Sequence, residues 1–184
     1  DKVDLDYLVR YTNAPWLVVQ NPGGADHGLF ARDANGAPLA WDVTKEELVD
    51  ARLPEIHPAV VGEFTLADGR KAVPSFQLLA DRYMAGDYAP DAVADRCGIP
   101  ADTIRRIARE LAEVAFEQQI TLDVEWTDWA GRKHSQITGR PVAMHAMRGI
   151  SAHSNGFHTC RAIHVLQVLL GSVEVPGGFR FKPP

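Results

Sequence analysis

The sequence predicts an α/β fold that carries an irregular β-hairpin excursion near the N-terminus. Three observations point to it. In residues 74–184, helical periodicity alternates with short apolar strands, whereas residues 20–73 hold short apolar runs separated by turn signals. The stretch 139–170 reads as a short buried strand, a polar loop of small residues and a helix. Open α/β sheets use that order to hold an anionic ligand at the carboxyl ends of their strands.

Residues 1–19 predict a lead-in helix and strand. The apolar residues of Asp4–Arg10 fall on one face of a helix. Trp16–Val19 is a brief apolar run after a proline, which favours a strand. The Asn21–Gly24 turn residues then end that strand.

Residues 20–73 predict a β-rich excursion built from two hairpins. The first spans Leu29–Asp42 and reverses at Asn35-Gly36, a pair that tolerates the positive φ of a tight turn. The second spans Glu63–Val73 and reverses at Asp68-Gly69.

Three helices are expected next. The first follows Pro74 and ends at Gly86, and the second begins at Pro90 and stops at Gly98. The third begins at Pro100 and has the strongest pattern, because its apolar residues recur every three and four positions. They are Ile104, Ile107, Ala108, Leu111, Val114 and Ala115.

The last third of the chain predicts the strand, loop and helix named above. Ile120–Lys133 reads as a strand with a turn at Ala130-Gly131. Pro141–Met147 reads as the buried strand, and Phe157–Leu170 as the apolar helix.

Composition excludes several classes of protein. A net charge of -5 argues against a nucleic-acid binder, which usually carries a basic stripe. No apolar run approaches the roughly 20 residues that span a bilayer, so direct membrane insertion is not expected, and no signal peptide is visible. Cys97 and Cys160 have neither disulfide-framework nor zinc spacing. The chain lacks an initiator methionine and ends in Lys-Pro-Pro, as expected for a segment of something longer.

A set of motifs also follows one another in order. They are Asp6–Asn13, Gly98–Ala112, Gly149-x-x-x-His153-x-x-Gly156, Arg161-Ala162, Leu169-Leu170-Gly171 and Pro176-Gly177-Gly178. This order resembles that of molybdopterin oxidoreductases of the dimethyl-sulfoxide-reductase family. In that family a helix similar to Gly98–Ala112 precedes a pterin-site strand. The phrase Met144–Gly156 is most similar to catalytic subunits of sulfite dehydrogenases and of thiosulfate or polysulfide reductases.

The resemblance implies a segment of a catalytic subunit several hundred residues long. Residues 74–184 would belong to a Rossmann-like domain that binds a bis(molybdopterin guanine dinucleotide) cofactor with molybdenum. The parent enzyme would act on a sulfur oxyanion such as sulfite or thiosulfate. Its molybdenum ligand and iron–sulfur cluster would lie outside this segment, which alone would be inactive.

The resemblance also implies partners and a compartment. The partners would be the rest of the catalytic subunit, an iron–sulfur subunit for electron transfer, and a membrane anchor subunit. These would hold the enzyme at the cytoplasmic face of the membrane, with a periplasmic location as the open alternative.

The same resemblance implies which residues contact the cofactor: Arg148, Gly149, Ser151, Ala152, His153, Asn155 and Gly156. In periplasmic nitrate reductases the equivalents of Arg148 and Ala152 touch the pterin, but those relatives carry Met and Gln there. An amide contact would therefore become a backbone contact at Ala152. Arg148 would add a cation near a phosphate or an oxyanion. No catalytic residue and no metal ligand are expected within the segment.

Other interpretations remain open from the residues alone. The Arg148–Gly156 loop is also what an ordinary strand-to-helix connection looks like, since it has no dinucleotide or P-loop fingerprint. The chain could be a stand-alone α/β module that binds a nucleotide or an anion without catalysis. Residues 20–73 could instead contact a partner subunit. His145, His153, His158, His164 and Cys160 do not have a standard zinc spacing.

Overall fold

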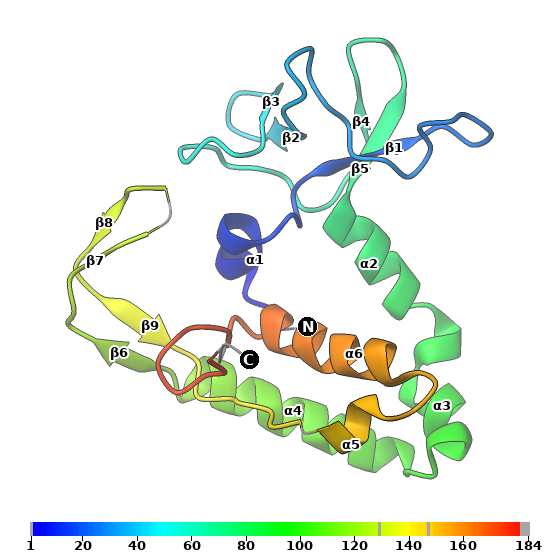
Figure 1. The fold of residues 1–184 in the computed structure, drawn as a ribbon, viewed down its shortest axis with the longest axis vertical. Helices are drawn as coiled ribbons and strands as arrows, with labels where there is room; N and C mark the ends of the chain where they lie inside the picture. Colours follow the sequence, from blue (N-terminus) through cyan, green and yellow to red (C-terminus); the bar gives the residue numbers. More distant parts are fainter. Residues whose placement is uncertain (1, 129, 147, 181–184) are drawn as a thin grey trace. The chain divides into compact units, whose positions relative to one another are not determined.

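The computed structural model describes residues 2–128, 130–146 and 148–180 as a mixture of helices and short strands (Figure 1). The elements of the first half are α1 (Leu5–Tyr11), β1 (Leu17–Gln20), β2 (Leu39–Asp42), β3 (Glu47–Asp50), β4 (Phe64–Thr65), β5 (Lys71–Pro74), α2 (Ser75–Tyr83) and the 3-10 helix η1 (Gly86–Tyr88). Those of the second half are α3 (Pro90–Cys97), α4 (Ala101–Glu117), β6 (Ile120–Leu122), β7 (Trp126–Thr127), β8 (Lys133–His134), β9 (Ile137–Gly139), α5 (Arg148–Ser151) and α6 (Gly156–Leu169).

The chain forms two compact units. One is Leu8–Val93, and the other joins Asp1–Tyr7 to Ala94–Pro184. The second unit is therefore discontinuous in sequence, with the first unit inserted after its opening residues.

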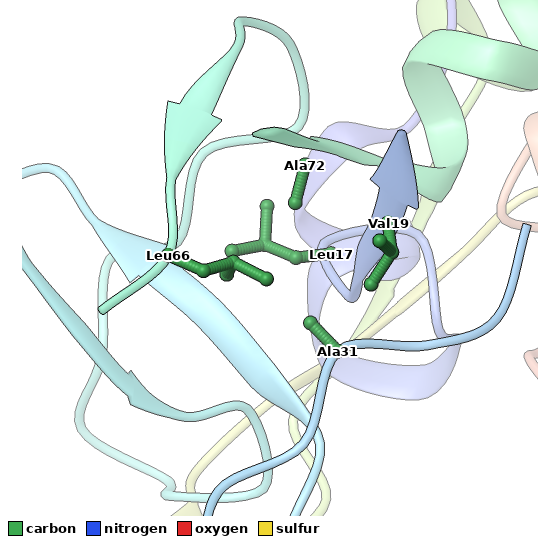
Figure 2. Packing of buried hydrophobic residues seen from close by; sticks show 5 residues of the cluster. All are labelled: Leu17, Val19, Ala31, Leu66 and Ala72. Atoms are coloured by element: carbon green, nitrogen blue, oxygen red, sulfur yellow. The ribbon is translucent and has the colours of Figure 1, made fainter. Parts of the chain in front are cut away.

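The Leu8–Val93 unit is built on an antiparallel sheet in the order β1-β5-β4. Leu17 of β1 lies opposite Pro74 of β5, and Gln20 lies opposite Lys71. Its core is a cluster of small and branched apolar side chains, shown in Figure 2: Leu17, Val19, Ala31, Leu66 and Ala72. The alternating burial of β5 places Ala72 in this core, as expected for a sheet with one covered face.

The second predicted hairpin is confirmed. β4 and β5 pair antiparallel, and the chain reverses at Asp68-Gly69. Gly69 has a φ of 87°, a conformation that residues with a Cβ rarely adopt. The Asp68 carboxylate accepts a hydrogen bond from the Arg70 backbone N–H at 3.1 Å, which closes the turn.

The first predicted hairpin is only partly correct. The reversal at Asn35-Gly36 is present, and Gly36 has a φ of 82°. However, the regular partner of β2 is β3, with Ala40 opposite Val49. β3 was not predicted because the turn that connects it to β2 has no glycine. The Asp42 carboxylate instead accepts hydrogen bonds from the backbone N–H groups of Thr44 and Lys45 at 2.8 and 3.2 Å.

The predicted helices are confirmed to within a few residues as α1, α2, α3, α4 and α6. Gly98 ends α3 with a φ of 66°, the left-handed conformation expected after a helix. In α4, however, Ala115 is the one residue of the predicted apolar stripe that is fully buried. It packs with Val142 and Leu170, and Leu111 and Val114 lie partly buried against them.

The predicted strand at Pro141–Met147 is wrong for residues 141–146, and Met147 lies outside the described residues. A strand exists only when its backbone pairs with a neighbour. Val142 donates its N–H to the carbonyl of Arg140, only two residues back, at 2.7 Å. The backbone of Ala143–Ala146 has no hydrogen-bond partner among the described residues.

All strand ladders within the described ranges are antiparallel. The fold is therefore mixed α and β, as predicted, but the parallel layer of a Rossmann-like domain is not formed by the described residues. Of the helices that the structure describes, none is long and apolar enough to cross a membrane.

Candidate cofactor-binding site

The seven predicted contact residues lie together where α5 meets α6, a region we call the α5–α6 corner (residues 148–159). The prediction of a loop throughout this region is wrong, because Arg148–Ser151 form one helical turn. Ala152 closes that turn by donating its N–H to the Arg148 carbonyl at 3.1 Å. The His153 carbonyl then accepts the N–H of Gly156 at 2.9 Å, and α6 begins there.

Gly156 allows α5 and α6 to pack closely at the corner. It is buried, and a Cβ at this position would overlap the backbone carbonyl of Ser151. Only glycine lets the first turn of α6 approach α5 so closely. The predicted glycine at this position therefore has a structural role, whatever ligand the corner binds.

The polar side chains of the corner point to a site for an anion. Arg148, Ser151, His153 and Asn155 are all exposed. Asn155 is the N-cap residue of α6, but its side chain makes no capping hydrogen bond. Residues 148–159 contain no Asp or Glu. The Ser151 hydroxyl donates to the Arg148 carbonyl at 2.9 Å.

Backbone donors at the start of α6 add to this set. Gly156 and Thr159 donate their N–H groups to the carbonyls of His153 and Asn155. The N–H groups of Phe157 and His158 have no acceptor among the described residues. Free N–H groups at the N-terminus of a 14-residue helix favour negative charge.

The segment that leads into the corner is anchored by a reciprocal contact between glycine and proline. A Cβ on Gly139 would overlap the backbone of Pro176, and a Cβ on Gly177 would lie 3.0 Å from the Cα of Pro141. The two chain segments therefore pass each other at backbone distance. The Pro176-Gly177-Gly178 motif thus packs against residues 139–141.

Arg140 anchors the segment that leads into the corner through hydrogen bonds, a role that was not predicted from the sequence. Its guanidinium donates to the Asp4 carboxylate at 2.9 and 3.1 Å. It also donates to the Ala115 carbonyl at 3.2 Å and to the Gln119 side chain at 2.8 Å. Asp4 and Arg140 are 136 residues apart in sequence, so no local pattern could have paired them.

The N-terminal residues belong to the same unit through further bonds. The Asp4 N–H donates to the Leu169 carbonyl at 2.8 Å, and the Tyr7 hydroxyl donates to the Val173 carbonyl at 3.1 Å. A Cβ on Gly171 would overlap the Asp4 side chain. The start of the chain therefore contacts both the segment before the corner, at Arg140, and the end of α6 with the residues that follow it.

A second polar cluster lies at the β7–β8 turn. The buried Asp128 carboxylate accepts hydrogen bonds from Arg132 Nε at 2.7 Å and from the backbone N–H of Ala130 at 3.0 Å, and lies 3.1 Å from His134 Nε2. Burial alone would raise the pKa of Asp128. The hydrogen bonds from His134 and Arg132 outweigh it and hold that pKa well below its ordinary range. Trp126 stacks on His134, with 4.4 Å between ring centroids.

Within the described residues, no three or more His, Cys, Asp or Glu side chains converge as metal ligands would. Cys97 is exposed and Cys160 is half-buried, and both are free thiols. The donor set of the corner is cationic, hydroxyl and amide, which suits a phosphate or a heterocycle rather than a metal ion.

No family model matches the chain. Among curated proteins, it is 46% identical over 190 aligned residues to a sulfite dehydrogenase subunit of Allochromatium vinosum. That alignment covers 98% of this chain but 19% of the relative. The chain therefore spans about a fifth of the length of that relative.

Proposed function

We propose that this chain is a segment of a longer oxidoreductase subunit that acts on a sulfur oxyanion such as sulfite. In that subunit, the α5–α6 corner would hold part of a bis(molybdopterin guanine dinucleotide) cofactor with molybdenum. The observation that carries the proposal is the 46% identity, along 98% of the chain, to the sulfite dehydrogenase subunit. Identity at that level along almost the whole chain supports a shared parent architecture.

The donors of the corner fit the proposed cofactor. A pyrophosphate-linked nucleotide needs cationic and neutral hydrogen-bond donors, and residues 148–159 supply both and contain no Asp or Glu of their own. Arg148 and His153 would neutralise phosphate charge, and the free N–H groups of Phe157 and His158 would donate to a phosphate oxygen. Ala152 would contribute only its backbone, because its side chain has no polar atom. When bound, the cofactor supplies the oxygen-atom and electron transfer, and this segment orients one of its arms.

The unpaired segment Ala143–Ala146 supports a Rossmann-like parent domain. These residues are exposed or half-buried, and in the parent domain their free backbone groups would pair with a parallel strand from the rest of the subunit. The apolar stripe of α4, in which Ile107 is 44% exposed, would then lie against that sheet.

The partners follow from the same proposal. The rest of the catalytic subunit would carry the molybdenum ligand and the iron–sulfur cluster. An iron–sulfur subunit for electron transfer, together with a membrane anchor subunit, would hold the enzyme at the cytoplasmic face of the membrane.

Elemental and pterin analysis of the longer polypeptide tests the proposal. We expect molybdenum, together with the fluorescence of oxidised pterin, in the purified protein. Absence of both would contradict it. Micromolar binding of guanosine diphosphate by the 184-residue chain alone, measured by calorimetry, would instead favour a stand-alone nucleotide-binding module.

A further inference from the structure

The β6–β9 ladder has two chemically different faces. Its strands pair antiparallel, with Thr121 opposite Thr138 and Leu122 opposite Ile137. Residues directly opposite each other in an antiparallel pair point to the same face, and neighbours along a strand point to opposite faces. One face therefore carries Ile120, Leu122 and Ile137, which we call the apolar ladder face. The other face carries the two threonines.

The apolar ladder face is poorly covered. Ile120 is 37% exposed and Leu122 is 42% exposed, although Ile120 lies close to Gly177. Val124, two residues further along the chain, is 51% exposed. By contrast, alternation of apolar and polar residues is the pattern of a strand whose apolar face is packed on a core.

Two strands alone are not enough to make this face stable in water. Isolated two-stranded ladders are marginal and usually need a third strand or a packed apolar face. In Figure 1, β6 and β9 run side by side as a narrow ribbon, and within the described part of the chain their sheet has two strands. Both ladder edges thus have backbone groups that no strand among the described residues pairs with.

We propose that the apolar ladder face docks against an apolar surface of the remaining polypeptide of the parent subunit. This inference rests on the proposed function, because that function requires a longer chain. The curated relative has about four-fifths of its length outside the matched segment, which is ample chain to supply such a surface. The match covers 98% of the present chain, so it includes the ladder.

The composition of the face argues against a transiently bound subunit. Apart from Gly139, it consists of aliphatic side chains, without the mixture of polar and charged groups found in non-obligate interfaces. The β6–β9 ladder also joins the end of α4 directly to the Gly139–Pro176 crossing. Covering it would stabilise the framework that holds the α5–α6 corner.

Cysteine labelling tests this docking. Leu122→Cys probes the apolar ladder face, and Thr121→Cys, on the adjacent exposed residue of the opposite face, is the matched control. A Val124→Cys variant gives a second probe near the same face. Labelling would be followed peptide by peptide by mass spectrometry, so that Cys97 and Cys160 need not be replaced.

In the 184-residue chain, we expect Leu122→Cys and Thr121→Cys to label at similar rates. In the longer polypeptide, Leu122→Cys should label at least about tenfold more slowly than Thr121→Cys, because labelling must then wait for local opening. Equal rates in the longer polypeptide would overturn the inference. The inference would also be overturned if labelling of Leu122→Cys slowed only when a second subunit co-purified. It would be overturned too if labelling of the 184-residue chain slowed as its concentration rose, because that would indicate docking of a second copy. Molybdenum content is measured on the same samples, so failure of the proposed function is seen separately.

Discussion

Gly139 and Gly177 let two segments of the chain cross at backbone distance, and each lies against a proline of the other segment. Neither glycine is explained by its own turn alone. Gly139 lies in β9 and has no positive φ, so its only requirement is the absence of a Cβ. Steric overlap with Pro176 is therefore the physical reason for glycine at position 139.

Gly139→Ala should destabilise the chain by about 1–3 kcal/mol, because the added methyl group must displace the backbone of Pro176. The measurement is the free energy of unfolding from urea denaturation followed by circular dichroism. Gly149→Ala is the matched control, since a Cβ there meets no atom within 4 Å and the position is helical. That variant should be neutral or more stable by up to about 1 kcal/mol. Equal destabilisation by both variants would contradict the crossing.

Asp128 predicts a specific dependence of stability on pH. Its pKa is lowered in the folded state, so it contributes stability above the ordinary carboxyl pKa of about 3.9. That contribution is lost as the pH falls through the lowered folded-state pKa. Asp128→Asn should therefore lower the urea midpoint at pH 7 and reduce the loss of stability between about pH 4 and pH 2.

Asp102→Asn is the control for this prediction, because the Asp102 side chain is fully exposed. Its urea midpoint should stay close to that of the unmodified chain at every pH, because its exposed ion pair with Arg105 contributes little stability. If Asp128→Asn also followed the unmodified chain, the buried network would not stabilise the fold.

Elements formed by local chemistry were predicted well from sequence. The periodicity of residues 101–117 predicts α4, and Asp68-Gly69 predicts the β4–β5 turn. Two other elements were not. β3 was missed, although Asp42 followed by Thr44 is a sequence signal for the turn that precedes it. The strand at 141–146 was predicted from apolar content, but its pairing partner is not among the described residues.

The candidate site likewise has features that could be predicted from the sequence and features that could not. The grouping of Arg148, His153 and Asn155 at the α5–α6 corner could be predicted, because all three are close in sequence. The helical turn at Arg148–Ser151 could not, since Gly149 and Ser151 are poor helix formers. The Asp4–Arg140 pair depends on the tertiary fold alone.

That ion pair ties the N-terminal element to the segment before the corner, and a double-mutant cycle measures it. Both side chains are largely buried, at 13% and 16% exposed, so Asp4→Asn and Arg140→Gln should each cost about 1–3 kcal/mol. The coupling energy should be about 1–2 kcal/mol, because each variant removes the same charged pair. Arg106→Gln with Glu110→Gln is the control cycle, because that exposed i,i+4 pair should couple by only about 0.5 kcal/mol. Additive effects at Asp4 and Arg140 would contradict the anchoring role.

At the scale of the whole molecule, the Leu8–Val93 unit contains a complete sheet and its own core. Residues 8–93 expressed alone should therefore fold. Two-dimensional amide NMR should show dispersed signals, and urea unfolding should be cooperative. Poorly dispersed signals, typical of a random coil, would mean that folding of residues 8–93 depends on the remainder of the chain.

The central claim is that the α5–α6 corner holds a guanine nucleotide arm of a molybdenum cofactor. Its most direct test is cofactor retention in the longer polypeptide carrying Arg148→Ala, Ser151→Ala and His153→Ala together. Arg106→Ala with Arg109→Ala, on the exposed surface of α4, is the control. The purified variants would be diluted so that weakly held cofactor dissociates, and the molybdenum and acid-released guanine nucleotide that stay with the protein would then be measured. We predict about tenfold weaker retention in the corner variant, which corresponds to a loss of about 1.4 kcal/mol, and unchanged retention in the control. Equal retention in both variants would contradict the claim.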